Sequence, residues 1–297
     1  SLPKNIKIAW RFFGYELYGK RKDVFLSKKS AQYNSSTNKS SFQNILNILT
    51  KVYQIIKFGG AAKSLFQKAI QRIDYMLVLS QEEYNLLLNY WPNLPKFIKI
   101  PHYFYDEDIT LPNFSLKNQD EKPIVVLGNN RSSYNNHLDL IDMIDMNPGK
   151  SNYFFNLLFN YGSEGNYTNA VRKSIEGKPY YGLIDNFIPP DKFKYFYQKI
   201  SALVINGYRQ MAGANIRMAL RNGVKVYLNK KNIYLVWLLN EGFKVYTIED
   251  FQKDLKMKNI QLDKDTAQKN IEQLKKFSAR YNKENFQKNI YNKIKDT

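Results

Sequence analysis

The sequence predicts an α/β fold in which parallel β-sheets carry helices on both faces, arranged in two domains. The chain has 297 residues, 43% of them hydrophobic, which is enough for two domains with buried cores. After residue 122, short apolar runs alternate with segments of helical periodicity, as is typical of a doubly wound parallel sheet. Glycine and asparagine cluster where several of the expected strands end.

The first domain is expected at residues 1–118. Its expected strands lie at residues 5–10, 75–80 and 97–101. A polar loop is expected at 27–41, and a linker at 106–122. Between residues 42 and 72, apolar positions at helical spacing are accompanied by lysine and arginine, which predicts a basic amphipathic helix pair. Ser80 is a good N-cap for a helix over residues 81–90.

The second domain is expected at residues 119–297. Its expected strands lie at residues 124–127, 153–160, 180–187, 202–206, 224–228 and 243–246. Its expected helices lie at residues 137–146, 166–176, 190–199, 214–222, 232–240 and 265–295. Pro190 suits a first helical turn, and Gly177 and Gly223 suit helix ends.

The composition excludes several kinds of site. The chain has no cysteine and two histidines, which rules out disulfides, cysteine-ligated zinc, iron–sulfur clusters and a thiol nucleophile, and leaves little for a histidine metal site. Its longest apolar runs are far shorter than the roughly 20 residues that span a bilayer, and we expect no leader peptide. We therefore expect a cytoplasmic protein that is soluble or peripheral to a membrane.

Positive charge is concentrated early in the chain. Residues 1–80 hold 14 lysines and arginines against 3 acidic residues, whereas the other residues hold 31 against 23. Such a surface suits the phosphates of nucleic acid, or an anionic membrane, where each basic residue contributes about 1 kcal/mol. An AT-rich genome, which enriches Lys, Asn, Ile and Tyr, is the alternative explanation of the excess. The charge leaves these explanations open, because it reports on partners and solubility and not on fold.

The first loop that could carry chemistry runs from Gly128 to His137, between an expected strand and an expected helix. Its glycine permits close approach of a ligand, and its amides, hydroxyls and helix N-terminus offer hydrogen-bond donors to a phosphate. The loop lacks the spacing of a dinucleotide fingerprint and the GKS or GKT ending of an ATPase loop. It is a candidate phosphate site, with an ordinary asparagine-rich turn as the alternative.

Two further loops follow expected strands, beyond whose carboxyl ends the ligands of open parallel sheets bind. Residues 207–213 place Arg209 before a helix, where a permanent charge favours phosphate or pyrophosphate; a surface arginine beside a turn is the alternative. Residues 161–165 place Tyr161 and Glu164 at the same edge. Glu164 either binds sugar hydroxyls or is solvated, and we favour the latter.

Two other features are weaker candidates. Asp106-Glu107-Asp108 fits the D-x-D pattern that binds a divalent metal and a nucleoside diphosphate in one class of sugar transferase. It lies in the expected linker and not at a strand end, so we expect no metal there. His137 has the chemistry of a general base, but a histidine at a helix start beside two asparagines is as often structural.

Four segments carry a resemblance to a known family. The specific ones are VVLGNNRSSYNNH at 125–137, similar to a strand–G-N-S–N-N-H loop, and VINGYRQMAGANIRMALRNGVKVYLN at 204–229, similar to an R-Q-x-G…L-x-x-G-x-x-V-x-L-N block. NYGSEGNYTNAV at 160–171 and, more weakly, IAWRFFGYELYG at 8–19 also match family segments. In this order they resemble glycosyltransferase family 56, the TDP-N-acetylfucosamine:lipid II N-acetylfucosaminyltransferases or 4-alpha-L-fucosyltransferases. Tyr15-Glu16 stand where that family tends to have Ala-Asp.

The resemblance implies a GT-B architecture, with two Rossmann-like domains facing a cleft: an acceptor domain at 1–118, lacking its opening strand and glycine loop, and a nucleotide-sugar domain at 119–297. The C-terminal helix would pack back towards the first domain. The implied donor is a dTDP-activated deoxy-amino sugar, N-acetylfucosamine-like, and the implied acceptor is a polyprenyl-diphosphate-linked saccharide. The reaction would serve bacterial surface polysaccharide synthesis, as of O-antigen or enterobacterial common antigen, at the cytoplasmic face of the inner membrane. No metal or cofactor is implied.

Each candidate residue then has an expected role. Arg209 would stabilise the leaving diphosphate, and Glu16 would activate the acceptor hydroxyl. The residues expected to bind the nucleotide sugar are Gly128, Asn129, Asn130, Arg131, Ser132, Asn136, His137, Tyr161, Gly162, Gln210, Gly213 and Asn215. Lys51, Lys57 and Lys63 would dock on an anionic membrane surface or the acceptor's diphosphate, and no nucleic acid is expected. Two rivals remain, a basic nucleic-acid-binding protein and an inactive membrane-associated scaffold of transferase ancestry.

Overall fold

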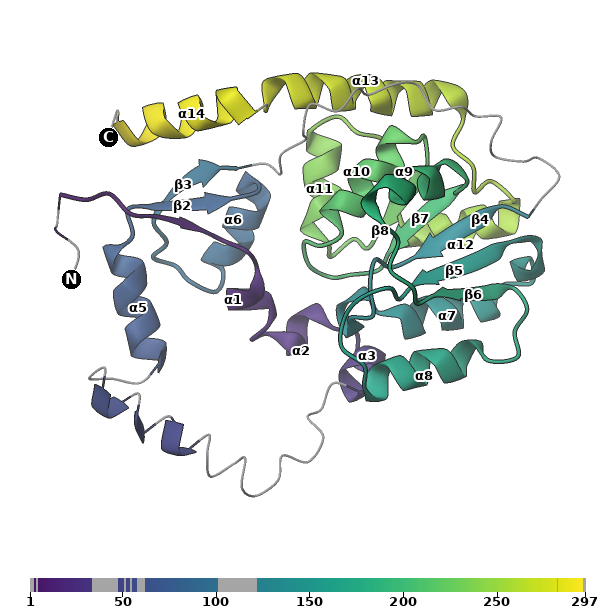
Figure 1. Cartoon of the computed structure of the whole chain (residues 1–297), viewed down its shortest axis with the longest axis horizontal. Coiled ribbons are helices and arrows are strands. Elements are labelled where there is room, and N and C mark those ends of the chain that lie inside the picture. The colour runs from purple at the N-terminus through teal and green to yellow at the C-terminus, as the bar shows by residue number, and fades with distance from the viewer. Residues whose placement is uncertain are drawn as a thin grey trace. The chain divides into compact units, whose positions relative to one another are not determined.

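The computed structural model describes residues 3, 5–33, 48–50, 52–53, 55–57, 62–100, 122–281 and 283–295 (Figure 1). Contacts between residues group the chain into two units. The first unit comprises residues 1–17, 35–102 and 283–297, and the second comprises residues 18–34 and 103–282. Compared with the expected division at residue 118, residues 18–34 and 103–118 group with the second unit and residues 283–297 with the first.

The second unit is built on a six-stranded sheet in which every neighbouring pair of strands is parallel. Its strands are β4 (Ile124–Leu127), β5 (Phe154–Leu158), β6 (Tyr181–Ile184), β7 (Ala202–Ile205), β8 (Lys225–Leu228) and β9 (Tyr246–Thr247). Their order across the sheet is β6-β5-β4-β7-β8-β9, so the winding reverses between β4 and β7 (Figure 1). The prediction of a doubly wound parallel sheet is confirmed.

Helices surround this sheet. They are α2 (Lys22–Phe25), α3 (Lys28–Gln32), α7 (His137–Asp145), α8 (Asn166–Ile175), α9 (Pro190–Gln198), α10 (Gly213–Arg221), α11 (Ile233–Asn240), α12 (Ile248–Met257) and α13 (Lys264–Arg280), with short 3-10 turns η2 (Ser133–Asn135) and η3 (Lys150–Asn152). The sequence analysis missed α2, α3 and α12. It was also wrong to expect one helix over 265–295, because α13 ends at Arg280 and a separate helix, α14 (Lys283–Lys295), follows.

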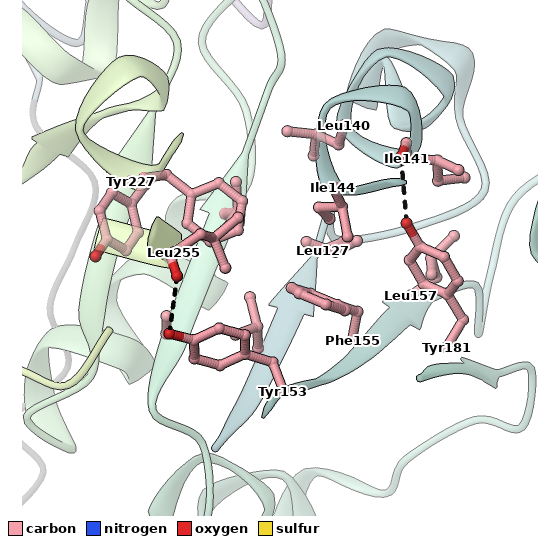
Figure 2. Close-up of a cluster of buried hydrophobic side chains, with 14 of the residues drawn as sticks. Leu127, Leu140, Ile141, Ile144, Tyr153, Phe155, Leu157, Tyr181, Tyr227 and Leu255 are labelled. Carbon is pink, nitrogen blue, oxygen red and sulfur yellow. Dashed lines mark hydrogen bonds between the residues drawn. The ribbon is translucent and has the colours of Figure 1, made fainter. Parts of the chain in front are cut away.

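Figure 2 shows the core that positions the strands of the second unit. Phe155 and Leu157 of β5 are fully buried against Ile144 of α7. The hydroxyl of Tyr153, just before β5, donates a hydrogen bond to the carbonyl of Leu255 in α12 at 3.3 Å. Each fully buried side chain of this size contributes about 1.5–3 kcal/mol. Packing against α7 and α12 therefore fixes the position of β5 in the sheet.

The first unit holds a three-stranded parallel sheet in the order β1-β2-β3. Its elements are β1 (Ala9–Arg11), β2 (Tyr75–Val78), β3 (Lys96–Lys99), α5 (Ala62–Arg72) and α6 (Gln81–Leu88). Ser80 caps α6 as expected, because its side chain accepts a hydrogen bond from Glu83 N–H at 3.2 Å. The Trp91 ring packs on Trp10 and Phe66, with centroid separations of 6.1 and 5.1 Å. No helix in the described part of the chain has the length and apolar character needed to cross a bilayer.

Candidate functional site

The strand order of the second unit creates one position suited to a ligand. β4 and β7 are neighbours, the strands that follow β4 lie on one side of the pair, and those that follow β7 lie on the other. Loops that leave such a pair diverge, and ligands bind between them beyond the carboxyl ends of the strands. The two loops here, residues 128–136 and 206–212, overlap the two that the sequence predicts as anion sites, residues 128–137 and 207–213. We call residues 128–137 and 206–215 the switch-point site.

Gly128 begins this site in a conformation that glycine alone adopts easily. Its φ is +71°, and its N–H donates to the carbonyl of Val204 at 2.9 Å, which holds the start of the loop against β7. A Cβ at this position would overlap Nε2 of His137. His137 is fully buried, and its Nδ1 lies 3.1 Å from the hydroxyl of Tyr167. The His137 side chain therefore packs against the start of the loop, and its burial keeps it away from a ligand.

Burial lowers the pKa of His137 from 6.5 to about 3. Between these values the unfolded chain binds a proton that the native state excludes, so the free energy of unfolding falls as the pH drops from about 6.5 towards 3. We expect His137→Asn to reduce this slope by roughly 1.4 kcal/mol per pH unit between about pH 6 and pH 4. Urea unfolding at a series of pH values measures it. Equal slopes in the two proteins would contradict the buried, neutral imidazole.

The loop 128–132 does not form the phosphate cradle that its composition suggests, because most of its backbone donors are already used. Gly128 is bound to β7 as above, and Asn129 N–H donates to the side-chain oxygen of Asn135 at 3.2 Å. Arg131 N–H donates to the carbonyl of Tyr161 at 3.0 Å. Ser132 N–H donates to the side-chain oxygen of Asn130 at 2.8 Å. Four of the five N–H groups in this stretch are therefore occupied within the protein.

The first turn of α10 is a second place at the switch point where backbone donors could meet an anion. α10 follows Ala212, which has a left-handed φ of 63°, and the helical hydrogen bonds begin with Ile216 N–H to Ala212 at 2.9 Å. The N–H groups of Gly213, Ala214 and Asn215 find no acceptor among the described residues. Three open donors at the positive end of a helix dipole are suited to a phosphate group.

Arg209, which precedes this helix, is held between two aromatic rings. Its guanidinium carbon lies 4.7 Å from the ring centroid of Tyr134 and 5.6 Å from that of Tyr18. The Tyr134 hydroxyl donates to the carbonyl of Tyr18 at 2.9 Å, which ties the two aromatic residues together. Arg209 also donates from Nη1 to the carbonyl of Gln210 at 3.2 Å. Aromatic stacking orients a guanidinium without neutralising it, so its charge can still serve an anion.

Tyr18 belongs to a segment, residues 18–34, that the sequence analysis does not connect with the site. Ser27 anchors it: its N–H donates to the side-chain oxygen of Asn136 at 2.9 Å, and its hydroxyl donates to Asp139 at 2.6 Å. Asn136 is fully buried and has a left-handed φ of 48°. Asn136 therefore holds this segment on the site and is not a ligand contact. The one local signal was Ser27 itself, the N-cap of α3.

A pocket of about 350 Å³ adjoins the switch-point site. We call it the tyrosine pocket, after Tyr33, Tyr134, Tyr161 and Tyr167 in its wall. It is also lined by five residues expected to bind the nucleotide sugar, namely Asn130, Arg131, Ser132, Tyr161 and Gly162. Two others, Asn129 and Asn215, are buried and donate from their side chains to the hydroxyls of Tyr161 and Tyr197, each at 3.0 Å. The residues expected to bind the nucleotide sugar thus fall into two groups. Some are buried and hold the loops in place, whereas others line the tyrosine pocket or the switch-point site.

Arg131 is less available to a ligand than the sequence suggests. It lies 2.7 Å from Glu164 and 3.6 Å from Asp185, and Arg172 pairs with the same two carboxylates. The hydrogen bonds from Arg172 are the main reason why the pKa of Glu164 falls to about 2. Glu164 is therefore held in ion pairs, and it is not simply solvated as we expect from the sequence. These four groups fix one wall of the tyrosine pocket and largely neutralise one another.

The remaining candidates lie in the first unit or outside the described residues. Glu16 is in α1 (Tyr15–Tyr18), and its Oε2 has no hydrogen-bond partner among the residues described. Lys57 is exposed, with its ammonium 5.3 Å from the Tyr53 ring centroid. Lys51, the side chain of Lys63 and the D-x-D motif at 106–108 lie outside the described residues. Within the described part of the chain, no three His, Asp or Glu side chains cluster closely enough to hold a metal.

Comparison of the fold with solved structures places it in a known class. One similar structure is the GtfA/B complex (TM-score 0.56, 11% identity), where the match covers 99% of this chain and 53% of that one. Another is a TarM mutant from S. aureus in complex with Fondaparinux, alpha-GlcNAc-glycerol and UDP (TM-score 0.57, 14% identity, 77% and 45% covered). Sucrose-phosphate synthase from Thermosynechococcus elongatus also matches (TM-score 0.55, 12% identity, 84% and 61% covered). The fold is that of GT-B glycosyltransferases.

These matches define the fold and its extent. The chain spans about half the length of the first two structures and 61% of the third. No family model matches the sequence, and no curated protein matches it. The resemblance to family 56 therefore stays a prediction.

Proposed function

We propose that the protein is a glycosyltransferase that takes its sugar from a nucleoside diphosphate. The observation that carries the proposal is the pairing, at the switch point, of the stacked guanidinium of Arg209 with the open first turn of α10, residues 213–215. A diphosphate is the group that this combination of planar cation and convergent N–H donors recognises best. The GT-B fold supports the proposal, because nucleotide sugars are the donors of that class.

The proposed chemistry follows from where charge develops. When the bond between the anomeric carbon and the phosphate oxygen breaks, the leaving diphosphate gains negative charge. Arg209 and the α10 donors stabilise that charge most in the transition state, which lowers the barrier. Glu16 is proposed to take the proton of the acceptor hydroxyl, since one oxygen of its carboxylate has no hydrogen-bond partner among the described residues. The tyrosine pocket is proposed to hold the nucleoside, with tyrosine faces against the base.

The identities of donor and acceptor rest on the resemblance to family 56. We propose a dTDP-activated, N-acetylfucosamine-like deoxy-amino sugar as donor, and a polyprenyl-diphosphate-linked saccharide as acceptor. The protein would act at the cytoplasmic face of a bacterial inner membrane, in the synthesis of a surface polysaccharide of the O-antigen or enterobacterial common antigen kind.

Thermal unfolding in the presence of ligands tests the proposal and its rivals. A ligand at 100 times its dissociation constant stabilises the native state by about 2.7 kcal/mol. We expect dTDP to raise the melting temperature more than UDP, GDP or single-stranded DNA does. A response to DNA alone would identify the nucleic-acid-binding rival. Binding of dTDP without any turnover would identify the inactive scaffold.

A membrane role is proposed for the region around residue 50. Among its described residues, six large apolar side chains are 46–77% exposed, namely Ile48, Leu49, Val52, Tyr53, Ile55 and Ile56. Lys57 is exposed beside them, and this region belongs to residues 1–80, whose sequence holds an excess of positive charge. Apolar side chains flanked by lysine are the composition that binds the surface of an anionic bilayer.

Changing Lys51, Lys57 and Lys63 together to Glu should release the protein from anionic vesicles. At about 1 kcal/mol per basic residue, the loss of affinity should be at least about 100-fold. A matched triple change of exposed lysines in the second unit, Lys173, Lys269 and Lys276 to Glu, should reduce binding far less. Co-sedimentation with phosphatidylglycerol vesicles measures both. Equal losses from the two triple variants would show a general charge effect and contradict a membrane-binding face.

A further inference from the structure

A chain of asparagine side chains crosses the carboxyl ends of three neighbouring strands. Asn136, after β4, and Asn206, after β7, exchange two hydrogen bonds, from each side-chain amide to the other's carbonyl, at 3.0 and 3.3 Å. Asn229, after β8, donates from its amide to the Asn206 side-chain oxygen at 2.7 Å. The side-chain oxygen of Asn229 in turn accepts from Lys231 N–H at 2.9 Å. This chain, which the sequence analysis did not foresee, fixes the backbone at Lys231 relative to the switch point.

The turn that carries Lys231 is fixed on its other side as well. Asn232, which is fully buried, donates from its N–H to the carbonyl of Asn229 at 2.8 Å. Its side-chain oxygen accepts from Tyr234 N–H at 3.0 Å and caps α11. The Lys231 side chain therefore projects from a rigid turn at the carboxyl end of β8, the strand next to β7.

Lys231 points to the switch-point loop, and no carboxylate among the described residues pairs with it. Its ammonium lies 4.3 Å from the ring centroid of Tyr208, the residue before Arg209. It is exposed and makes no ion pair with any residue in the described ranges. Its neighbour Lys230 differs, because it pairs with Glu249 at 3.3 Å. Arg209 of the loop 206–212 thus stacks on Tyr134, which follows β4. Lys231, which follows β8, contacts Tyr208 of the same loop.

We infer that Lys231 is a second cation for the donor's diphosphate, acting from the β8 side of the loop that carries Arg209. The inference rests on the proposed function and adds a residue to it. A diphosphate carries more negative charge than one guanidinium offsets, and an ammonium is a compact point charge that suits a phosphate oxygen. The ring of Tyr208 holds the ammonium near the loop while leaving it charged. Asn206 and Asn229 serve as positioning residues, since they set the turn.

Isothermal titration of Lys231→Met with dTDP, UDP and the nucleosides thymidine and uridine tests the inference. Loss of a charge-assisted hydrogen bond should weaken the preferred nucleoside diphosphate by about 10- to 100-fold, and the nucleoside hardly at all. Lys230→Met is the matched control and should bind within about twofold of wild type, because that ammonium already has a partner. Circular dichroism should show both variants folded, since both side chains are exposed.

The outcomes separate the two claims. If the wild type binds a nucleoside diphosphate and Lys231→Met binds it equally well, the role of Lys231 is wrong and the proposed function stands. If Lys231→Met weakens the nucleoside and the diphosphate equally, the residue acts on the fold of the site and the inference also fails. If the wild type binds no nucleoside diphosphate, both claims fall.

Discussion

Replacing Arg209 by glutamine should lower the turnover of sugar transfer by about 100- to 1,000-fold, which is the usual cost of removing one donor from a charge-stabilising site. Glutamine keeps hydrogen-bonding atoms and much of the length, but it loses the charge that meets the leaving diphosphate. The free energy of unfolding should change little, because the guanidinium stacks on Tyr134 and Tyr18 and fills no core position. Steady-state kinetics with saturating donor and acceptor measures the effect.

Two further variants give this prediction its control. Arg209→Lys keeps the charge without the planar group that stacks on two rings, so its turnover should fall between glutamine and wild type. Arg280→Gln removes an arginine on α13 that pairs with Glu241 at 3.3 Å, and should leave turnover unchanged. Turnover of Arg209→Gln within threefold of wild type would remove Arg209 from the mechanism.

Replacing Asp254 by alanine should destabilise the protein by about 3–5 kcal/mol, because it leaves a buried ammonium without its counter-charge. Lys225 and Asp254 lie 2.8 Å apart, with side chains only 5% and 13% exposed. Asp254 also accepts from the hydroxyl of Tyr227 at 2.7 Å, and Lys225 donates to the carbonyl of Asn259 at 2.9 Å. The pair joins the start of β8 to α12, at the end of the sheet opposite the switch point. Urea unfolding measures the cost.

The exposed pair Lys230–Glu249 is the matched comparison, because its side chains are 61% and 55% exposed. Glu249→Ala should cost no more than about 1 kcal/mol. Replacing Lys225 and Asp254 together by Met and Leu should cost less than Asp254→Ala alone, since no unpaired charge stays buried. Equal costs for Asp254→Ala and Glu249→Ala would contradict the account of this pair.

The sequence predicts the sheet of the second unit well because buried parallel strands read as continuous apolar runs, as Ala202 to Ile205 does. The helix α12 was not predicted, although Ile248, Phe251 and Leu255 recur in it at helical spacing and the last two are buried. A better signal was present in the capping box of Thr247 and Asp250, whose side chains each bond the other's backbone N–H.

Site residues were harder to predict, because their partners are distant in sequence. Arg131 has the composition of an anion site, but Glu164 and Asp185, 33 and 54 positions later, neutralise it. In the loop 128–132, the N–H of Asn129 is occupied by the side-chain oxygen of Asn135. Asn135 is fully buried, and no local sequence pattern indicates this burial. Tyr18 comes from a segment attached through Ser27, over a hundred residues before Asn136. Only the three-dimensional fold shows that the stacked guanidinium of Arg209 and the first turn of α10 come together at the switch point.

The central claim is that the switch point binds a nucleotide sugar and releases its diphosphate. The most direct test is turnover with a panel of dTDP- and UDP-sugars and a polyprenyl-diphosphate-linked disaccharide, with release of the nucleoside diphosphate and glycosylation of the lipid followed together. We predict release and glycosylation in equal amounts, fastest with a dTDP-deoxy-amino sugar, and about 100- to 1,000-fold slower with Arg209→Gln. Lack of turnover with every donor, combined with no binding of any nucleoside diphosphate, would contradict it.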